Sequence, residues 1–311
     1  MTPEQASLLI KEAAYKLGFG ACGIAQVASA DTEALYFDQW IAAGNHAGMQ
    51  YMENYRALRL DPTDLIPGAQ SIISVALNYY PTVKQVPDAP QIAYYAYGKD
   101  YHLVMKAKLQ QLCSELIEPL GILPSPTQAR CFTDSAPLLE RYWAWKAGLG
   151  WIGKNTNLII PKQGSYFFLG ELVVDIPLAY DAPIKSRCGS CTQCLKHCPT
   201  GALEAPRMLN ANKCLSYLTI EHKGEIPAEQ AAQLDKRFYG CDTCQQVCPW
   251  NRFAHPTQEA AFEPNPALLA LDEDTLATLT REQYQQIFKN SPVKRAKYEG
   301  LMRTQAQRKV T

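Results

Sequence analysis

Apolar stretches separated by helical patterns fill residues 1–180 of the chain. Three stretches are rich in β-branched and aromatic residues and are bounded by proline and glycine, as strands are, at residues 71–80, 158–161 and 166–175. Segments with apolar residues at helical spacing surround them, at residues 4–17, 101–117 and 136–147. This alternation predicts a mixed α/β domain over residues 1–180.

The composition changes twice after this domain. Residues 177–185 have the character of a linker, and residues 187–251 are rich in cysteine, glycine and proline. Such a segment buries little apolar surface, so we expect metal binding to hold it together. Helical patterns return towards the C-terminus. The sequence therefore predicts an α+β fold in three parts, with boundaries at residues 1–180, 181–255 and 256–311.

The charge and the first residues indicate where the protein works. Thirty Lys and Arg balance thirty Asp and Glu, so any contact with nucleic acid must come from a local basic patch. The N-terminal segment carries early acids and has neither a charged region before a long apolar run nor an Arg-Arg export pair. No stretch reaches the roughly 18 to 20 apolar residues of a membrane span. We expect a globular cytoplasmic protein with no membrane contact.

Eleven cysteines in a cytoplasmic chain favour metal binding or catalysis over disulfides, because the thiol pools of that compartment reduce exposed bridges. Eight of them lie between Cys188 and Cys248. The other three, Cys22, Cys113 and Cys131, are scattered singly and are best interpreted as small buried apolar side chains.

The spacing of the eight cysteines predicts two 4Fe-4S clusters. The first motif is Cys188-x2-Cys191-x2-Cys194-x3-Cys198-Pro199, the bacterial ferredoxin run in which the fourth thiolate ligates the other cluster. The second motif, Cys241-x2-Cys244-x3-Cys248-Pro249, lacks one ligand that the isolated Cys214 can supply. In such pairs of runs the last cysteine of each run ligates the cluster of the other run, which we call the crossing rule. This rule assigns one cluster to Cys188, Cys191, Cys194 and Cys248, and the other to Cys198, Cys214, Cys241 and Cys244.

The alternative for these cysteines is zinc, but a tetrahedral site uses two spaced pairs and not a four-cysteine run that ends in Cys-Pro. His197 lies inside the first motif and is interpreted as a neighbour of the cluster or a surface residue, because eight thiolates already complete two clusters. No G-x-G-x-x-G turn or P-loop supports a nucleotide partner. The clusters therefore deliver electrons to another centre, and the chain is expected to be an electron-transfer enzyme or enzyme subunit.

Two stretches of the α/β domain have the composition of a ligand pocket, residues 94–102 and residues 131–170. Their glycines permit close approach of a flat ligand, and their aromatic residues supply stacking area. Hydrogen-bonding groups come from Asp134, Arg141, Lys154 and Asn157. The alternatives are that the glycines form turns, the aromatic residues belong to the core, and Arg141 with Glu140 is ordinary helix-surface charge.

The segments Thr-Asp-Ser-Ala-Pro-Leu-Leu-Glu-Arg at residues 133–141, Gly-Trp-Ile-Gly-Lys-Asn at 150–155 and Gly-Ser-Tyr-Phe-Phe-Leu-Gly-Glu at 164–171, with the cysteine motifs, resemble the epoxyqueuosine reductase family. Asp61-Pro62 and residues 65–69 and 76–81 are also similar. The resemblance implies cobalamin bound without its own base as lower ligand, in a nitroreductase-like α/β domain beside a ferredoxin-like module. Reductive dehalogenases share this plan.

The reaction that the resemblance implies is reduction of epoxyqueuosine to queuosine at the wobble position of tRNA, the last step of queuosine biosynthesis. Two electrons and two protons remove the epoxide oxygen as water. On this resemblance the clusters would reduce the cobalt, the cobalt would attack the epoxide, and Asp134 would be the catalytic acid that protonates the alkoxide. A proton donor at Asp134 requires burial that raises its pKa above the ordinary value of about 3.9. The alternative is that Asp134 caps a helix beginning near Ser135.

The resemblance also implies contact residues. We assign cobalamin binding to Arg56, Tyr97, Asp134, Asn157, Ser165, Leu169 and Ser216. We assign tRNA binding to His102, Arg141, Lys154, Lys294, Arg295 and Lys297. A lower histidine ligand is not expected, because Asp100-Tyr101-His102 lacks the glycine of the Asp-x-His-x-x-Gly corrinoid motif. His102 is then either a satisfied pocket histidine or a substrate contact.

Residues 281–311 carry eight Lys and Arg against two acids. This basic excess suits phosphate contacts with a tRNA stem, and a solvated basic helix end is the alternative. Longer members of the family continue into helical repeats beyond the counterpart of Met302, so substrate binding here is expected to rely more on the core. The expected partners are tRNA and an external low-potential electron donor, with a monomeric protein. The alternative functions are a cytosolic reductive dehalogenase and a dicluster electron carrier.

Overall fold

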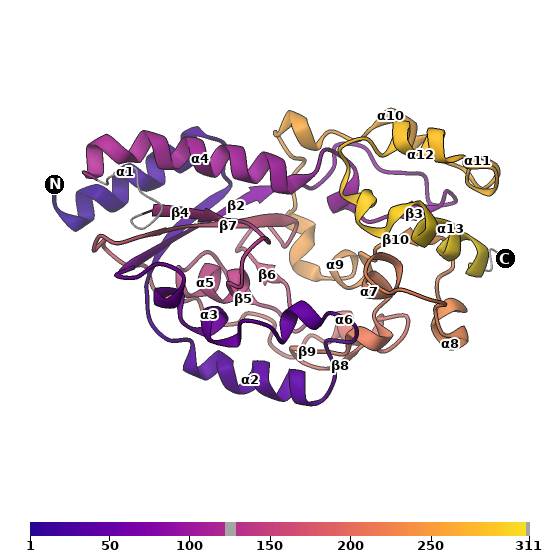
Figure 1. The fold of residues 1–311 in the computed structure, drawn as a ribbon, viewed down its shortest axis with the longest axis horizontal. Helices are drawn as coiled ribbons and strands as arrows, with labels where there is room; N and C mark the ends of the chain where they lie inside the picture. Colours follow the sequence, from indigo (N-terminus) through magenta and orange to yellow (C-terminus); the bar gives the residue numbers. More distant parts are fainter. Residues whose placement is uncertain (122–128, 309–311) are drawn as a thin grey trace.

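The computed structural model describes residues 1–121 and 129–308. One end of the molecule is built on an antiparallel sheet with strand order β1-β2-β7-β4 (Figure 1). Its strands, in sequence order, are β1 (Ala21–Gln26), β2 (Ser71–Asn78), β4 (Ala129–Phe132) and β7 (Phe167–Val174). The strands predicted at residues 71–80 and 166–175 correspond to β2 and β7, whereas the two edge strands were not predicted.

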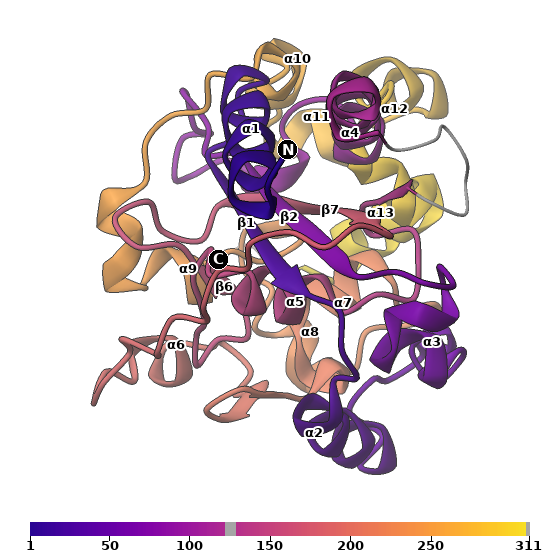
Figure 2. The same cartoon turned by 90° about the vertical axis from the view of Figure 1, so that its left-hand side faces the viewer.

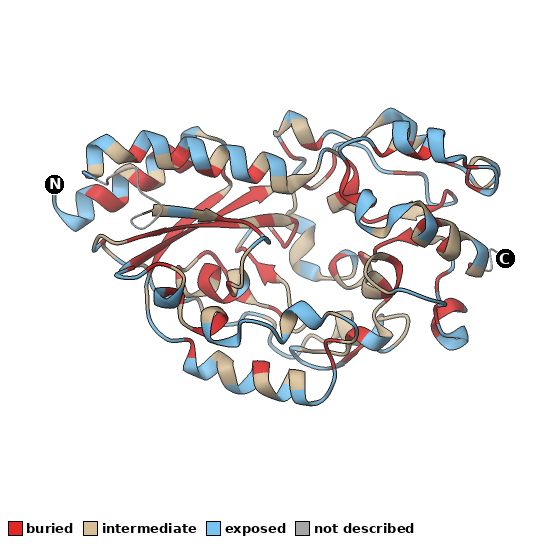
Figure 3. Cartoon of the chain, in the orientation of Figure 1, coloured by how far each residue is buried: buried red, intermediate tan, exposed pale blue. Residues whose placement is uncertain are grey.

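Helices cover both faces of this sheet (Figures 1 and 2). α1 (Pro3–Lys16) and α4 (Tyr101–Leu120) lie on one face, and α5 (Glu140–Lys146) packs against the other. Alternate residues of β2 serve two cores: Ile73 packs towards α1 and α4, and Ile72 packs towards α5. The prediction of a mixed α/β fold is confirmed. Figure 3 shows the buried residues concentrated on the strands and on the inward faces of the helices.

Capping residues fix where the two long helices begin. Thr2 and Gln5 form a capping box at the start of α1, with Pro3 in its first turn. The Asp100 carboxylate accepts a hydrogen bond from the His102 backbone amide at the start of α4. This second cap also sets the orientation of the first residues of α4, which reach the candidate site. Within the described residues, no helix is both long and apolar enough to cross a membrane.

Two further helices and two short strands complete the α/β part. α2 and α3 lie beyond α5 on the same side of the sheet (Figures 1 and 2). The strand predicted at residues 158–161 corresponds to a two-residue strand that pairs in a hairpin with its neighbour. The bounds are α2 (Asp31–Ala42), α3 (Arg56–Leu60), β5 (Trp151–Ile152) and β6 (Leu158–Ile159).

The cysteine-rich segment consists of short elements joined by turns, as its composition predicts. β10 pairs in parallel with β3, which comes from the N-terminal half of the sequence. The segment therefore packs against residues far away in the chain. Its elements, with β3, are β3 (Gln91–Ile92), α6 (Gln193–Lys196), β8 (Leu203–Ala205), β9 (Met208–Leu209), α7 (Leu215–Ile220), α8 (Ala228–Ala231), β10 (Arg237–Tyr239) and α9 (Thr243–Gln246).

The C-terminal helices share one core with residues from two other parts of the sequence. Ile92 and Tyr97 pack there with Phe238 and with the apolar faces of the C-terminal helices. The core thus crosses the sequence boundaries proposed at residues 180 and 255. These helices are α10 (Pro266–Leu269), α11 (Glu273–Ala277), α12 (Arg281–Ile287) and α13 (Lys297–Gln307). The 3₁₀ helices of the described residues are η1 (Gln50–Met52), η2 (Pro62–Asp64), η3 (Tyr94–Ala96), η4 (Ala211–Lys213), η5 (Pro249–Phe253), η6 (Ala260–Phe262) and η7 (Pro292–Ala296).

Two predictions about local structure are wrong. The helix predicted from residue 136 begins only at Glu140, because the residue before Pro137 disfavours helical backbone angles. Residues 177–185, predicted as a linker, are extended and bound to the sheet layer: the Asp181 carboxylate accepts hydrogen bonds from the Lys11 ammonium at 2.7 Å and from the Ile24 amide at 2.9 Å. The first difference matters for function, since it leaves Asp134 in a loop.

Candidate functional site

The structure brings the eight cysteines together in two groups of four. Lys154, Asn155, Trp250 and other residues line a cavity of about 120 Å³ with Cys188, Cys191, Cys194 and Cys248. In the second group, burial, together with the nearby Cys241 and Cys198, raises the pKa of the Cys214 thiol to about 11. Burial, Cys241, Cys214 and Cys198 likewise raise the pKa of Cys244. These are the sets that the crossing rule assigns to two clusters; ligation itself stays a prediction.

The thiols fit iron-sulfur clusters by their chemistry. Burial and the neighbouring Cys248, Cys188 and Cys191 raise the pKa of Cys194, so crowded thiolates need positive irons to stay deprotonated. In the described part of the chain, no three His, Cys, Asp or Glu side chains converge on one point as ligands of a single metal ion do. His197 is exposed, with its Nδ1 3.0 Å from the Gln193 carbonyl.

A loop of the α/β part holds both cysteine motifs. The Lys154 ammonium donates hydrogen bonds to the carbonyls of Gly189 at 2.7 Å and Cys191 at 2.8 Å. The Asn155 amide donates to the Cys244 carbonyl at 3.2 Å. Lys154, predicted to contact tRNA, is therefore already bound to the first cysteine motif. The loop between β5 and β6 fixes the cysteine-rich segment against the sheet.

Asp134 lies in the loop between β4 and α5, two residues beyond the end of the strand. Its backbone has a φ of 47°, a left-handed conformation that Asp and Asn tolerate better than most residues. The Glu140 carboxylate accepts a hydrogen bond from the Asp134 amide. The N-cap of α5 is Leu139, which makes no capping side-chain bond, so the interpretation of Asp134 as a helix cap is wrong.

The first turn of α4 supplies the partners of the Asp134 carboxylate. The Tyr101 hydroxyl donates to Asp134 Oδ2 at 2.5 Å, and His102 Nε2 lies 3.6 Å from the same oxygen. The other imidazole nitrogen, Nδ1, is 2.7 Å from the Asp100 carboxylate. His102 is thus held between two carboxylates from different parts of the sequence. Both of its ring nitrogens face carboxylates, and the expectation that no histidine serves as lower ligand stays a prediction.

Electrostatics puts the proton on His102 and not on Asp134. The hydrogen bond to Asp100, followed by the ion pair with Asp134, raises the pKa of His102 to about 9. Partial desolvation by the neighbouring residues raises the pKa of Asp134, but the ion pair with His102 and the hydrogen bond from Tyr101 outweigh this effect and leave the pKa below its ordinary value. The shift is opposite to the one that an acid at Asp134 requires. At neutral pH, Asp134 is ionised beside a protonated imidazole.

Two predicted tRNA contacts lie near this carboxylate. The hydrogen bond with Glu221 raises the pKa of Arg295, and the charge of Asp134 adds to the effect. Arg295 forms a two-pronged ion pair with Glu221, with N–O distances of 2.8 and 2.9 Å. Arg141 is exposed and donates to the Thr156 carbonyl at 2.9 Å. One region therefore contains Asp134 together with His102, Arg141 and Arg295. Lys154 lies outside it, because its ammonium is bound to the first cysteine motif.

Some of the basic residues of the C-terminal segment bind groups inside the protein and do not contribute to its surface charge. Arg308 has a fully buried side chain that binds Glu273 at 2.6 Å, and Arg303 donates to the carbonyls of Leu218 and Gly224. These two residues are unsuited to phosphate contacts. Lys294 and Lys297 are exposed, so the surface part of the basic patch is smaller than the sequence suggests. Lys309, also part of the predicted patch, lies outside the described residues.

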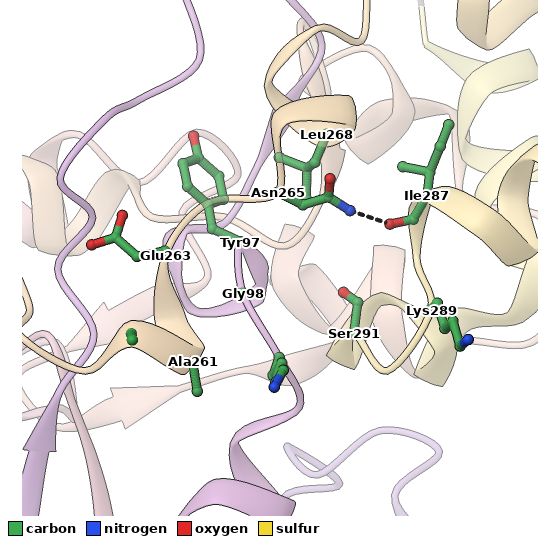
Figure 4. A pocket seen from close by; sticks show the side chains of 11 residues that line it. Tyr97, Gly98, Ala261, Glu263, Asn265, Leu268, Ile287, Lys289 and Ser291 are labelled. Atoms are coloured by element: carbon green, nitrogen blue, oxygen red, sulfur yellow. Dashed lines mark hydrogen bonds between the residues drawn. The ribbon is translucent and has the colours of Figure 1, made fainter.

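The predicted cobalamin contacts are scattered. Tyr97 is 1% exposed, and its hydroxyl accepts a hydrogen bond from the Gln85 amide at 3.2 Å. Figure 4 shows it beside Asn265 and Leu268, in a cavity of about 170 Å³ in the C-terminal part. The ring is therefore a core residue. The exposed Arg56 forms a two-pronged ion pair with Asp38.

The other predicted cofactor residues lie closer to the cysteine motifs and the Asp134 loop. The buried Ser165 hydroxyl donates to Gln245 at 2.9 Å, behind the second motif. The Leu169 carbonyl accepts from the Thr133 hydroxyl at 2.9 Å, next to Asp134. Asn157 is half-buried in the loop that holds both motifs, and Ser216 is in the first turn of α7.

Sequence reasoning missed three groups of this site. Asp100 was considered only as part of a corrinoid motif. Its position two residues before His102 also allows its carboxylate to cap α4 and to bind the His102 imidazole. Glu140 was considered as surface charge. Glu171 was not considered, although it is the one charged residue in the apolar strand Phe167–Val174.

Family models match two segments of the chain. The model described as epoxyqueuosine reductase QueG, DUF1730 matches residues 59–135, and the 4Fe-4S double cluster binding domain matches residues 187–251. Epoxyqueuosine reductase of Cellulophaga algicola is 46% identical over 302 residues, which cover 97% of each chain.

Solved structures show the same likeness. An epoxyqueuosine reductase crystallised with an epoxyqueuosine-modified tRNA-Tyr stem loop matches with a TM-score of 0.86 and 31% identity, over 98% of this chain and 80% of that one. The Bacillus subtilis epoxyqueuosine reductase, solved with its catalytic aspartate loop swung out of the active site, has a TM-score of 0.84, 31% identity and coverage of 98% and 80%. A B12-dependent reductive dehalogenase shares the fold at 17% identity and a TM-score of 0.52, over 97% of this chain and 36% of its own.

Proposed function

This chain belongs to the epoxyqueuosine reductase family, and we propose that it reduces epoxyqueuosine to queuosine at the wobble position of tRNA. The observation that carries the proposal is the near full-length match to an epoxyqueuosine reductase bound to its modified tRNA stem loop. The two family models include Asp134 and all eight cysteines. The likeness to a reductive dehalogenase concerns the fold alone and does not support that alternative function. A simple electron carrier would not need the site around Asp134, so this second alternative is also disfavoured.

The two groups of thiols hold two 4Fe-4S clusters that deliver electrons singly. The reaction consumes two electrons and two protons and releases the epoxide oxygen as water. An external donor of low potential supplies the electrons to the clusters. We expect the protein to act as a monomer in the cytoplasm, where its tRNA substrate is found.

The surroundings of Asp134 fit a flat cofactor. The Asp134 side chain is 64% exposed, and Tyr51 is 45% exposed. Partial burial, followed by the charges of Glu221 and Asp134, raises the pKa of Tyr51, so its ring lies within electrostatic reach of Asp134. Cobalamin and substrate can cover these groups, and Asn157, Leu169 and Ser216 are the proposed contacts. Arg56 and Ser165 would have to exchange their present partners. When bound, cobalamin supplies an electron-rich cobalt centre for opening the epoxide.

Asp134 is the proposed catalytic residue, and His102 is the source of its proton. The ionised carboxylate lies beside a protonated imidazole, so a proton moves from His102 to Asp134 as the substrate alkoxide develops. Asp100 keeps the imidazole oriented and stabilises its charge after substrate binding. The catalytic aspartate loop of the Bacillus subtilis relative supports this role for the Asp134 loop.

The exposed cations near the site are the proposed tRNA contacts. Lys294, Arg295 and Lys297 lie at the end of η7 and the start of α13, and Arg295 is within electrostatic reach of Asp134. Their charges suit phosphates flanking the modified base, with Arg141 and His102 closer to the base itself.

The test is conversion of purified substrate. Protein reconstituted anaerobically with iron, sulfide and cobalamin is mixed with a chemical reductant and tRNA that carries epoxyqueuosine. Mass spectrometry of the digested nucleosides should show queuosine, lighter by one oxygen, and tRNA without the modification should remain unchanged. An absence of queuosine, although the absorption spectrum shows both cofactors, would refute the proposal.

A further inference from the structure

A buried carboxyl group lies in the middle of the main sheet. Glu171 of β7 is 0% exposed, and neither of its carboxylate oxygens has a hydrogen-bond partner among the described residues. On the neighbouring strand β2, Ser74 is paired with Glu171. The buried Ser74 hydroxyl also has no hydrogen-bond partner among the described residues. A buried polar group without a partner destabilises the fold, so this position needs a reason beyond stability.

Glu140 is bonded to the catalytic loop and also lies within electrostatic reach of Glu171. It is the first residue of α5, the helix that packs on the face of the sheet towards which Glu171 points, and its carboxylate accepts the Asp134 amide. Trp143, one turn later, is fully buried, and its indole N–H has no partner among the described residues. Unpartnered polar groups of β2, β7 and α5 thus lie between the sheet and the helix, where water can connect them.

The charges around the two glutamates favour their protonated forms. Burial, followed by the charge of Asp134, raises the pKa of Glu140 to about 8, although Arg141 and His102 act in the opposite direction. Burial, followed by the charge of Glu140, raises the pKa of Glu171 well above its ordinary value. No cation acts on Glu171 from the described elements around it.

We propose that Glu140 and Glu171 form a proton store behind Asp134 that supplies the second proton of the epoxide reduction. The inference rests on the proposed function. Reduction of the epoxide to an alkene takes two electrons from the external donor and two protons, and His102 holds only one proton to give. The second proton leaves the Glu140 carboxyl, reaches the departing oxygen through Asp134, and is replaced on Glu140 from Glu171. After product release, solvent at the exposed end of the site returns one proton to His102 and one, through Asp134 and Glu140, to the buried Glu171.

Paired substitutions separate proton supply from positioning. Glu140→Gln keeps a carbonyl oxygen for the Asp134 amide but holds no acidic proton, whereas Glu140→Ala removes both. Glu171→Gln removes the deeper proton, and Glu171→Met controls for packing. Single-turnover rates of the pre-reduced holoenzyme are measured with tRNA carrying epoxyqueuosine across pH 6 to 9.

The wild-type rate should fall above about pH 8 as Glu140 loses its proton. Glu140→Gln should be slower by about a hundredfold or more, and Glu171→Gln by about tenfold, with the alkaline limb altered in both. A Glu140→Gln enzyme with the wild-type rate and pH profile, beside an inactive Glu140→Ala enzyme, would reduce Glu140 to a structural latch and overturn the inference.

A second readout needs no substrate. Because the folded-state pKa of Glu140 is above its unfolded value of 4.5, its contribution to stability is full below about pH 4.5 and is lost as the pH rises through about 8. The thermal midpoint of the holoenzyme should therefore fall less steeply over this range in both Gln variants than in the wild type. Equal slopes would overturn the inference. A failure of the proposed function would appear separately, as a wild-type protein that shows the slope but makes no queuosine.

Discussion

Asp134→Asn tests the centre of the proposed mechanism with little disturbance of the fold. Asn accepts the left-handed backbone at φ 47° at least as readily as Asp does, and its side chain can still accept the Tyr101 hydroxyl bond. The charge lost is 64% exposed and lies 3.6 Å from His102. Such an exposed ion pair contributes at most about 1 kcal/mol, so the thermal midpoint should change little.

The expected loss is in turnover. Asn cannot carry a proton from His102 to the alkoxide, and a positioned proton donor contributes about a hundredfold to ten-thousandfold. This range corresponds to about 2.7 to 5.4 kcal/mol in the activation barrier. The pKa of His102 should also fall from about 9, while the larger effect of Asp100 remains.

The assay is single turnover of pre-reduced enzyme with tRNA that carries epoxyqueuosine, alongside cluster content, cobalamin binding and tRNA affinity. Asp272→Asn is the matched control, because Asp272 caps α11 and Asn caps a helix about as well as Asp. It should leave both stability and turnover near wild type. A near-normal rate for Asp134→Asn would remove Asp134 and the proton transfer from His102 from the mechanism.

Three further changes address the clusters, the tRNA surface and the C-terminal helices. Anaerobic reconstitution should give about eight irons and eight sulfides per chain, and Cys214→Ala should remove one cluster and leave the other, as iron content and EPR would show. Replacing Lys294 and Lys297 together by Ala should weaken tRNA binding and flatten its dependence on salt, while turnover at saturation is retained. Arg308→Ala should cost about 3 kcal/mol of stability in thermal unfolding, the low end for a broken buried pair, because Glu273 loses its partner.

The first two of these changes have controls in the same chain, and each of the three has an outcome that would contradict it. Cys22→Ala should leave both clusters intact, and equal loss of both clusters in Cys214→Ala would contradict the two groups of four. Replacing the exposed Lys16 and Lys106 on α1 and α4 should not alter the salt dependence. An unchanged slope for the Lys294 and Lys297 variant would assign that patch to solvent. A stable Arg308→Ala protein would show that Glu273 finds other partners.

Patterns that act over a few residues could be interpreted from the sequence. The cysteine spacing predicted two groups of four, since a ferredoxin run constrains the chain at intervals of two and three residues. The long apolar runs predicted β2 and β7, and helical spacing predicted α1 and α4. β1 and β4 have weaker patterns, because short edge strands depend on the neighbours with which they pair.

Only the tertiary structure decided the chemistry around Asp134. The sequence identified Asp134 as a candidate acid, but its pKa depends on Tyr101 and His102, which are more than 30 positions away in the chain. Their side chains reach it because α4 and the loop after β4 meet at one end of the sheet. A sequence pattern does not show which charges face each other across a fold. The direction of the pKa shift therefore could not be predicted.

The same reason explains the residues that changed role. Tyr97 was assigned to cobalamin binding and Arg308 belongs to the basic excess that suits tRNA. Long-range packing buries both side chains in the C-terminal part of the molecule. Lys154 is bound by carbonyls 35 and 37 residues away. The sequence by itself determined the cofactor-binding motifs and the main secondary structure, which are local. The partners, burial and protonation of each polar side chain depend on distant residues, and so the tertiary structure decided them.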